Sequence, residues 1–219
     1  GAENIVRAIQ TFNLHVGTVV GISTDKACKP VNVMGMTKAL QERVFITGNL
    51  SCPSTRFLCV RYGNVLASRG SVIPLFRQQI SMGGPVTITS PEMTRFLLSL
   101  DRAVDTILAA VDQGRPGEIF IPRVGAARVV DLAEALMGSR KVDIQVTGIR
   151  PGEKLHEVLV SEEEGQRTRV HSDDYFVIEP MLPELRDSST ERTPPVVAEF
   201  SSRNDLLDRP QIEELLARN

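Results

Sequence analysis

Blocks of apolar and polar residues follow one another along the chain in a pattern that predicts helices and strands in turn. Residues 1–12 repeat apolar side chains at steps of three and four, which gives a helix with one apolar face. Residues 18–22 are a short β-branched run, typical of a strand buried on both faces. A helix is predicted over residues 35–48, with Leu40 turned inward, and another buried strand over 56–61. This alternation predicts an α/β fold with a parallel sheet and crossover helices.

The elements after residue 62 are shorter and more polar. They comprise a helix capped by Ser71, extended segments at 86–89 and 95–99, a helix at 100–112, a strand at 118–121, a helix at 128–137, strands at 143–147 and 173–180, and a last helix after Asp208. The loop 150–154 is expected to lead to a short helix, and the acidic run 162–164 to form a solvated turn. We therefore expect a first domain over 1–62, a second region over 63–183 and a surface tail with a terminal helix over 184–219.

Composition narrows the class of protein. The chain has 219 residues, a formal charge of −2 and 42% hydrophobic residues, which is typical of a globular protein. A near-neutral chain does not favour nucleic-acid binding, and no apolar run reaches the ~18–20 residues of a membrane span. Cys28, Cys52 and Cys59 form no metal-site spacing, so we expect buried free thiols, a reducing cytoplasm and no metal.

Chemically active side chains concentrate between residues 23 and 38. Ser23, Thr24, Asp25 and Lys26 follow the first predicted strand, and open α/β sheets bind ligands beside the carboxyl ends of their strands. The carboxylate and the amine together supply a proton acceptor and a proton donor for chemistry next to a carbonyl. A solvated loop with an exposed ion pair is the alternative interpretation of the same residues.

A second amine follows on the next predicted helix. Met34 and Lys38 are four residues apart and share one helix face, from which Lys38 would reach a cofactor ribose. The alternative is a surface lysine beside a core methionine.

The same segment carries a family resemblance. The run STDKA-x-x-P-x-N-x-M-G-x-T-K resembles the active-site segment of extended short-chain dehydrogenases that act on nucleotide sugars, most narrowly the inverting UDP-N-acetylglucosamine 4,6-dehydratases. Four further blocks agree in order: RYGNVLASRGSVIPLFRQQI at 61–80, ITSPEMTRFLLSLDRAVD at 88–105, GEIFIP at 117–122 and RPGEKLHEVL at 150–159. The resemblance covers residues 1 to about 180. It implies a Rossmann-like sheet followed by a smaller α/β substrate domain.

The resemblance also implies roles for individual residues. Lys26 resembles the base at C5 of the sugar, Asp25 the acid that assists loss of the C6 hydroxyl, and Thr24 or Ser23 the partner of the C4 oxygen. The cofactor is expected to be NADP, and the substrate a UDP-sugar. The implied cofactor-binding residues are Ser23, Lys38, Tyr62, Asn64 and Val65, and the implied substrate-binding residues are Asn64, Arg69, Ser71, Arg95, Arg150 and Glu153.

Two departures from the family pattern qualify these expectations. No glycine-rich dinucleotide fingerprint is present in the sequence, so we expect the N-terminal strands of the sheet to be absent and this stretch alone to be inactive. Met34 stands where the superfamily usually has tyrosine, and a thioether transfers no proton. A branch of the inverting dehydratases resembles this sequence in having methionine there, with the neighbouring Asp and Lys assigned the proton chemistry.

Several functions remain open at this point. A cytoplasmic, homo-oligomeric dehydratase for surface polysaccharide or glycan biosynthesis is the favoured hypothesis. The alternatives are a nucleotide-sugar 4-epimerase, a non-catalytic sugar-nucleotide-binding homologue, and the soluble half of a membrane-anchored homologue.

Overall fold

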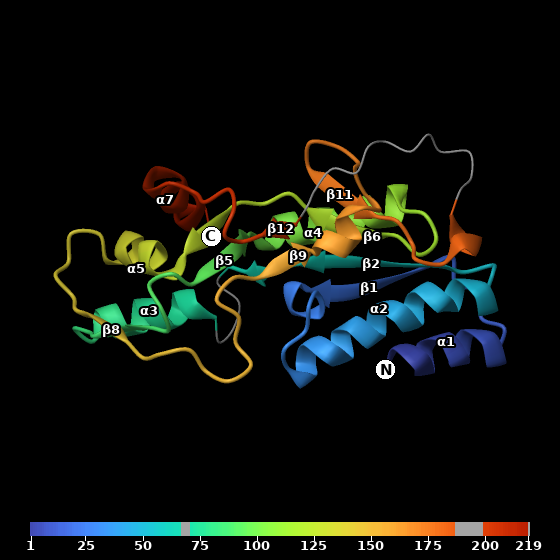
Figure 1. Cartoon of the computed structure of the whole chain (residues 1–219), viewed down its shortest axis with the longest axis horizontal. Helices are drawn as coiled ribbons and strands as arrows, with labels where there is room; N and C mark the ends of the chain where they lie inside the picture. The colour runs from blue at the N-terminus through green and yellow to red at the C-terminus, as the bar shows by residue number, and fades with distance from the viewer. Residues whose placement is uncertain (67–70, 187–198, 219) are drawn as a thin grey trace. The chain divides into compact units, whose positions relative to one another are not determined.

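The computed structural model describes residues 1–66, 71–186 and 199–218. The chain divides into two compact units, each assembled from three stretches of sequence (Figure 1). Unit 1 contains residues 1–62, 101–123 and 158–200, and unit 2 contains residues 63–100, 124–157 and 201–219.

Unit 1 is built around a five-stranded sheet. The strand order is β1-β2-β6-β11-β10, with β1 (Thr18–Thr24), β2 (Arg56–Tyr62) and β6 (Ile119–Pro122) parallel to one another. The strand β11 (Tyr175–Ile178) runs antiparallel to β6, and β10 (Thr168–Val170) runs antiparallel to β11. Both faces of a central strand in a parallel sheet are covered by other elements, and β2 is accordingly buried along its middle. The predicted α/β class with a parallel sheet is confirmed.

Helices cover both faces of this sheet, as Figure 1 shows. On one face lie α1 (Ala2–Thr11) and α2 (Val33–Ser51), and on the other lies α4 (Leu100–Gln113). Gly21 permits the close contact between β1 and α2, because a Cβ there would lie 2.5 Å from the Phe45 ring. On the far face, Ala110 of α4 packs with Leu58, Val60 and Phe120. The helices therefore hold the carboxyl ends of β1 and β2 in a rigid frame.

Unit 2 contains two small sheets. One pairs β3 (Asn64–Val65), β5 (Thr94–Leu98) and β7 (Ala126–Arg128), and the other pairs β4 (Val86–Ile88) with β8 (Ile144–Val146). Three helices pack on them: α3 (Val72–Ser81), α5 (Val129–Met137) and α7 (Arg209–Ala217). The predicted last helix is confirmed, and Asp208 and Gln211 form its capping box.

The remaining short elements connect these parts. They are the 3₁₀ turns Asp25–Ala27 and Pro183–Leu185, the strands β9 (Val158–Val160) and β12 (Phe200–Ser201), and the helix α6 (Glu162–Gly165). The units differ from the contiguous ranges 63–183 and 184–219 expected from the sequence. The physical reason is that residues 101–123 and 158–200 return to supply α4, β6, β10 and β11 to the sheet of β1 and β2.

Three local expectations are wrong. Leu40 is 63% exposed, whereas Glu42 on the same helix is buried. The loop 150–154 leads to β9 instead of a helix. The acidic run is the helix α6, capped by Ser161, and its last carboxylate, Glu164, is buried. Both buried glutamates bind Arg61, an ion pair that local apolar periodicity does not reveal.

The three cysteines are free and buried, as expected. Among the described residues, no helix combines the length and apolarity that crossing a membrane requires.

Candidate active site

The segment that follows β1 forms a tight, capped turn. β1 and β2 pair in parallel register, with Ser23 opposite Arg61 and Thr24 opposite Tyr62. Directly after β1, residues Asp25–Ala27 make one 3₁₀ turn, and the Thr24 hydroxyl accepts a hydrogen bond from the Lys26 N–H at 3.4 Å. The predicted reactive residues therefore lie at the carboxyl end of a parallel strand, where α/β sheets bind their ligands.

Three polar side chains meet at one oxygen in this turn. The Thr24 hydroxyl donates to Asp25 Oδ1 at 2.8 Å, and Lys26 Nζ donates to the same oxygen at 3.0 Å. The Asp25 side chain is fully buried, while the Lys26 side chain is 28% exposed. The buried Asp25 carboxylate thus orients the Thr24 hydroxyl and the Lys26 ammonium group, and both of these side chains are partly exposed to solvent. The structure brings Thr24, Asp25 and Lys26 together as the sequence predicts.

The start of α2 packs directly against this turn. Asn32 caps the helix by accepting a hydrogen bond from the Gly35 N–H at 2.8 Å. A Cβ at Gly35 would lie 2.3 Å from the Lys26 carbonyl oxygen, so the close approach requires glycine. Met34 is 47% exposed, one residue before this contact. The first turn of α2 therefore packs against the backbone of the Asp25–Ala27 turn.

Lys38 lies one turn further along α2 and points back to β1. Its Nζ donates to the Ile22 carbonyl oxygen at 2.9 Å and to Gln41 Oε1 at 3.1 Å. An ammonium group has three N–H donors, so these two bonds leave one for another acceptor. Lys38 is therefore an ordered cation at the same sheet edge as Lys26.

Ser23 has a different environment from its neighbours. Its side chain is buried, and its hydroxyl donates to Glu42 Oε1 at 2.5 Å. Glu42 in turn binds Arg61. The sequence pattern does not identify either charged residue as buried, although Arg61 opens the RYGN block and Glu42 follows Lys38 by one helical turn. Their pairing depends on contacts between distant segments.

Tyr62 ends β2 and is half-buried, which raises the pKa of its hydroxyl by desolvation. It belongs to unit 1, whereas Asn64 and Val65 begin unit 2 as strand β3. Asn64 is paired in register with Leu97 of β5.

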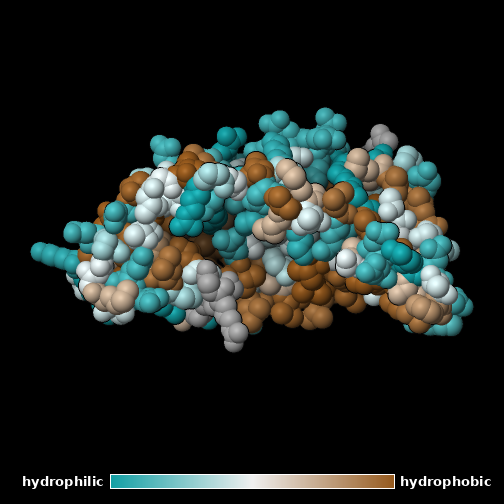
Figure 2. All heavy atoms as spheres, turned by 90° about the horizontal axis from the view of Figure 1, so that it is seen from below, coloured by the Kyte–Doolittle hydropathy of each residue, from teal (hydrophilic) through white to brown (hydrophobic). Residues whose placement is uncertain are grey.

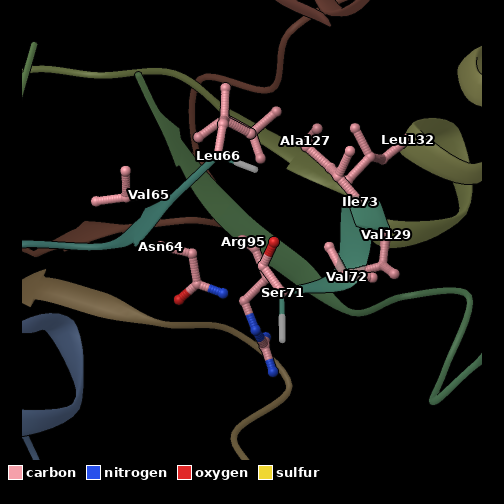
Figure 3. Close-up of a pocket in the computed structure, with 11 residues that line it drawn as sticks. Asn64, Val65, Leu66, Ser71, Val72, Ile73, Arg95, Ala127, Val129 and Leu132 are labelled. Carbon is pink, nitrogen blue, oxygen red and sulfur yellow. The ribbon is translucent and has the colours of Figure 1, made fainter. Parts of the chain in front are cut away.

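A pocket in unit 2 contains three of the predicted substrate-binding residues (Figure 3). Asn64, Ser71 and Arg95 supply its polar side, and apolar side chains that include Ile73 and Leu132 supply the rest. The Ser71 hydroxyl is buried and has no hydrogen-bond partner among the described residues. A buried hydroxyl without a partner costs about 1–3 kcal/mol, so this atom is suited to a ligand group.

The loop that carries the RPGEKLHE block is held to this pocket by Arg95. The Arg95 guanidinium donates to the carbonyl oxygens of Thr94 at 2.7 Å, Leu155 at 3.2 Å and Lys154 at 3.1 Å. Arg150 and Glu153, by contrast, lie 3.9 Å apart at the surface, where the Arg150 side chain is 75% exposed. Arg95 therefore acts on the loop's backbone, while Arg150 remains accessible. Arg69 lies outside the described residues.

A fold and a site of this kind define a class: extended short-chain dehydrogenases that act on nucleotide sugars, as the sequence blocks indicate. The comparison with family models makes the membership specific. Residues 1–180 match the model of the polysaccharide biosynthesis protein family, and the chain belongs to that family.

The sequence relatives include proteins named as two different enzymes and one uncharacterized membrane protein. The chain is 42% identical to an uncharacterized membrane protein of Methanocaldococcus jannaschii, over 82% of this chain and 56% of that protein. It is 48% identical to a UDP-glucose 4-epimerase of Rickettsia prowazekii, over 75% and 49% of the two chains. It is 40% identical to an inverting UDP-N-acetylglucosamine 4,6-dehydratase of Campylobacter jejuni, over 83% and 54%. The chain thus spans about half the length of these curated relatives.

Solved structures agree on the fold. The structure of Pen from Bacillus thuringiensis superposes with a TM-score of 0.86 and 28% identity, covering all of this chain and 66% of that one. The dTDP-glucose 4,6-dehydratase DesIV of Streptomyces venezuelae, solved with NAD, superposes with a TM-score of 0.61 and 19% identity over 70% of this chain and 54% of that one.

Proposed function

We propose that the protein takes part in the NADP-dependent dehydration of UDP-N-acetylglucosamine to a 4-keto-6-deoxy sugar nucleotide, with inversion at C5. The observation that carries the proposal is the convergence of Thr24 and Lys26 on one Asp25 oxygen at the carboxyl end of β1. The identity to the Campylobacter jejuni dehydratase supports the same reaction. We place the reaction in polysaccharide or glycan biosynthesis, in keeping with the family.

The residues present at this edge fit a nicotinamide dinucleotide. Such a cofactor supplies hydride transfer, to and from the sugar. Lys38 would hold the nicotinamide ribose, since its ammonium group is ordered by Ile22 and Gln41 and has a donor left for a hydroxyl. Tyr62, Asn64 and Val65 complete the set of cofactor-binding residues that we propose. Ser23, which the sequence suggests for the same role, is left out because its buried hydroxyl donates to Glu42. NAD in the solved relatives supports the cofactor class, and NADP is our choice within it.

The proton chemistry falls to the turn after β1. In the proposal the Thr24 hydroxyl binds the oxygen at C4. A proton that passes from the Lys26 ammonium group to the Asp25 carboxylate, across their 3.0 Å contact, leaves an amine and a carboxylic acid. Once C4 is a ketone, the amine removes the acidified proton at C5 and the acid assists departure of the C6 hydroxyl as water. Met34 transfers no proton and packs beside the turn.

The nucleotide end of the substrate belongs, in the proposal, to unit 2. The uridine part would enter the pocket of Figure 3, where the buried Ser71 hydroxyl would bind it. Arg150 would bind the diphosphate, because its side chain is 75% exposed, and the partly exposed Glu153 beside it would bind a ribose hydroxyl. Arg95 would hold the intervening loop in place.

A nucleotide-sugar 4-epimerase is the second candidate. The 48% identity to the Rickettsia prowazekii epimerase favours it. Epimerisation at C4 needs no base at C5, so a requirement for Lys26 distinguishes the two reactions.

The test is to incubate the full-length protein with UDP-N-acetylglucosamine and NADP⁺ in D₂O and to follow the sugar by NMR. Dehydration gives a 4-keto-6-deoxy product that carries deuterium at C5. Conversion to the C4 epimer without deuterium at C5 would establish the alternative, and an unchanged substrate would overturn both.

Location and assembly are proposals of the same kind. Three free, buried cysteines support a reducing, cytoplasmic setting. Exposed apolar side chains on two helices of unit 1, Leu40 (63%) and Leu108 (60%), support a homo-oligomer. Light scattering of the full-length protein measures the oligomeric state directly.

A further inference from the structure

A buried cluster of charges lies beneath the turn after β1. Arg61 of β2 is 1% exposed, and its guanidinium lies between Glu42 of α2 and Glu164 of α6, both also buried. The Arg61 donors reach Glu42 Oε1 and Oε2 at 2.9 and 2.7 Å, and Glu164 Oε2 and Oε1 at 2.9 Å each. A fifth bond, at 2.9 Å, goes to the Leu159 carbonyl oxygen. All five guanidinium donors are therefore used.

The two carboxylates are satisfied from their other sides as well. Glu164 accepts hydrogen bonds from the Ser161 N–H at 3.1 Å and from the Cys28 thiol at 3.6 Å. Burial alone would raise the pKa of Glu164, but the Arg61 guanidinium, the Ser161 N–H and the nearby Arg167 hold it at about 2. Glu164 is therefore charged at neutral pH.

Glu42 also accepts a hydrogen bond from the end of β1. Its Oε1 accepts from the Ser23 hydroxyl at 2.5 Å, and Ser23 is the residue before Thr24. Glu42 also follows Lys38 by four residues, so the two project from the same side of α2. One carboxylate thus joins the end of β1, the helix that carries Lys38, and, through Arg61, the strand β2.

A merely stabilising core would not need this arrangement. Replacing buried ion pairs by apolar side chains of similar volume is often neutral or stabilising, so a saturated ionic cluster is weak evidence for stability. Such a cluster does restrict geometry, because each donor has a single buried acceptor and cannot shift without leaving a charge unpaired. Displacing reacting groups by about 1 Å costs about a hundredfold in rate.

We infer that Glu42, held by Arg61, is a positioning residue that fixes Ser23 and through it the Thr24–Asp25–Lys26 turn. This inference rests on the proposed function for its catalytic consequence and on the cluster's geometry for its structural one. It also assigns the Ser23 hydroxyl to the protein's interior.

The test uses two substitutions in the full-length protein. Ser23→Ala removes the hydroxyl that joins the cluster to the turn and changes no charge. Glu42→Gln keeps the side-chain shape, but it replaces one of the two carboxylate oxygens that accept from Arg61 with an amide N–H₂ and removes the negative charge. Glu163→Gln is the matched control, because Glu163 lies on the same short helix as Glu164 and is exposed.

The first measurement is steady-state turnover of UDP-N-acetylglucosamine. We expect Ser23→Ala and Glu42→Gln to lower kcat by about tenfold to a hundredfold with KM changed by less than about twofold. Ser23→Thr, which keeps the hydroxyl, should recover rate relative to Ser23→Ala, and the Glu163→Gln control should keep the wild-type rate.

The second measurement is hydrogen exchange of the backbone amides of Asp25–Ala27, which does not depend on turnover. We expect exchange to be faster by about tenfold or more in both variants and unchanged in the control. If exchange accelerates but the wild-type protein does not convert the sugar, the proposed reaction fails and the structural inference holds.

Three results would overturn the inference. The first is wild-type exchange and wild-type kcat in Ser23→Ala. The second is a lower kcat with unchanged exchange, which would mean that Ser23 acts on a ligand directly. The third is faster exchange with unchanged kcat. Should Glu42→Gln fail to fold, Ser23→Ala alone decides, since it removes one hydroxyl and no charge.

Discussion

We expect the buried carboxylate of Glu164 in the ionic cluster to contribute a pH-dependent part of the stability of unit 1. We expect Glu164→Gln to destabilise the protein strongly at neutral pH and only weakly in acid. The substitution preserves the shape of the side chain and removes its charge. The two bonds from Arg61, at 2.9 Å each, then lose their charged acceptor in a buried site.

The magnitude follows from the pKa of Glu164. That pKa is about 2 in the folded protein, against an ordinary value of 4.5. A depressed carboxylate pKa stabilises the fold above the ordinary value, and the stabilisation is lost as the pH falls toward the folded value. With ~1.4 kcal/mol per unit of pKa, Glu164→Gln should cost about 3 kcal/mol at pH 7 and about 1 kcal/mol at pH 3. The cost at pH 7 is within the ~3–5 kcal/mol measured on breaking buried ion pairs.

Urea unfolding at several pH values between 3 and 7 measures this difference. The gap between wild type and Glu164→Gln should narrow with falling pH, because a protonated carboxyl and an amide are similar in shape and charge. Glu163→Gln, exposed on the same helix, should follow the wild type throughout. A gap that stays constant from pH 7 to pH 3 would refute the assignment of a buried, charged Glu164.

Four further substitutions test the site. Lys26→Met should lower kcat by about 10²–10⁴-fold while calorimetry shows unchanged UDP binding, and near-normal turnover would exclude Lys26 as the base. Met34→Ala should lower kcat by less than about tenfold, because sulfur passes no proton; a folded but inactive variant would contradict this. Gly35→Ala should lower the melting temperature and kcat together, since its Cβ would lie 2.3 Å from the Lys26 carbonyl oxygen, and a normal melting curve would disprove the contact. Ser71→Ala should stabilise the free protein by about 1 kcal/mol in urea unfolding and weaken UDP binding in calorimetry, because the buried hydroxyl has no partner among the described residues. Lower stability with unchanged affinity would contradict a role for Ser71 in ligand binding.

The parts of the fold set by local pattern could be predicted from the sequence. The β-branched run at 18–22 is the strand Thr18–Thr24, and the apolar run at 56–61 is the strand Arg56–Tyr62. The run at 56–61 is buried on both faces, as its composition indicates. The run at 18–22 forms the expected strand but is only partly buried, and Ile22 is 38% exposed, because β1 stands at the end of the strand order. The position of Asp25 and Lys26 at a sheet edge follows from the same strand, because residues that leave a parallel strand lie at its carboxyl end.

The polar interior could not be predicted in this way. Helical periodicity assigns Leu40 to the core, but the structure exposes Leu40 and buries Glu42 on the same helix. The cause is Arg61, which lies 19 residues from Glu42 and 103 from Glu164 in the sequence. Such a pairing exists only once β1, β2, α2 and α6 have assembled. The interleaving of the two units is equally non-local, since the strands β6, β11 and β10 join the sheet from later segments.

Two buried polar groups, Arg61 in unit 1 and Ser71 in unit 2, differ in whether the protein itself supplies their partners. In unit 1 every donor of the Arg61 guanidinium has an acceptor within the protein, so this cluster has nothing left to offer a ligand. In unit 2 the buried Ser71 hydroxyl has none among the described residues and lies in a pocket beside Asn64 and Arg95. Satisfied polar groups restrict geometry and unsatisfied ones gain free energy from a partner. On this ground we expect the Arg61 cluster to position the Thr24–Lys26 turn and the pocket of Figure 3 to bind a ligand.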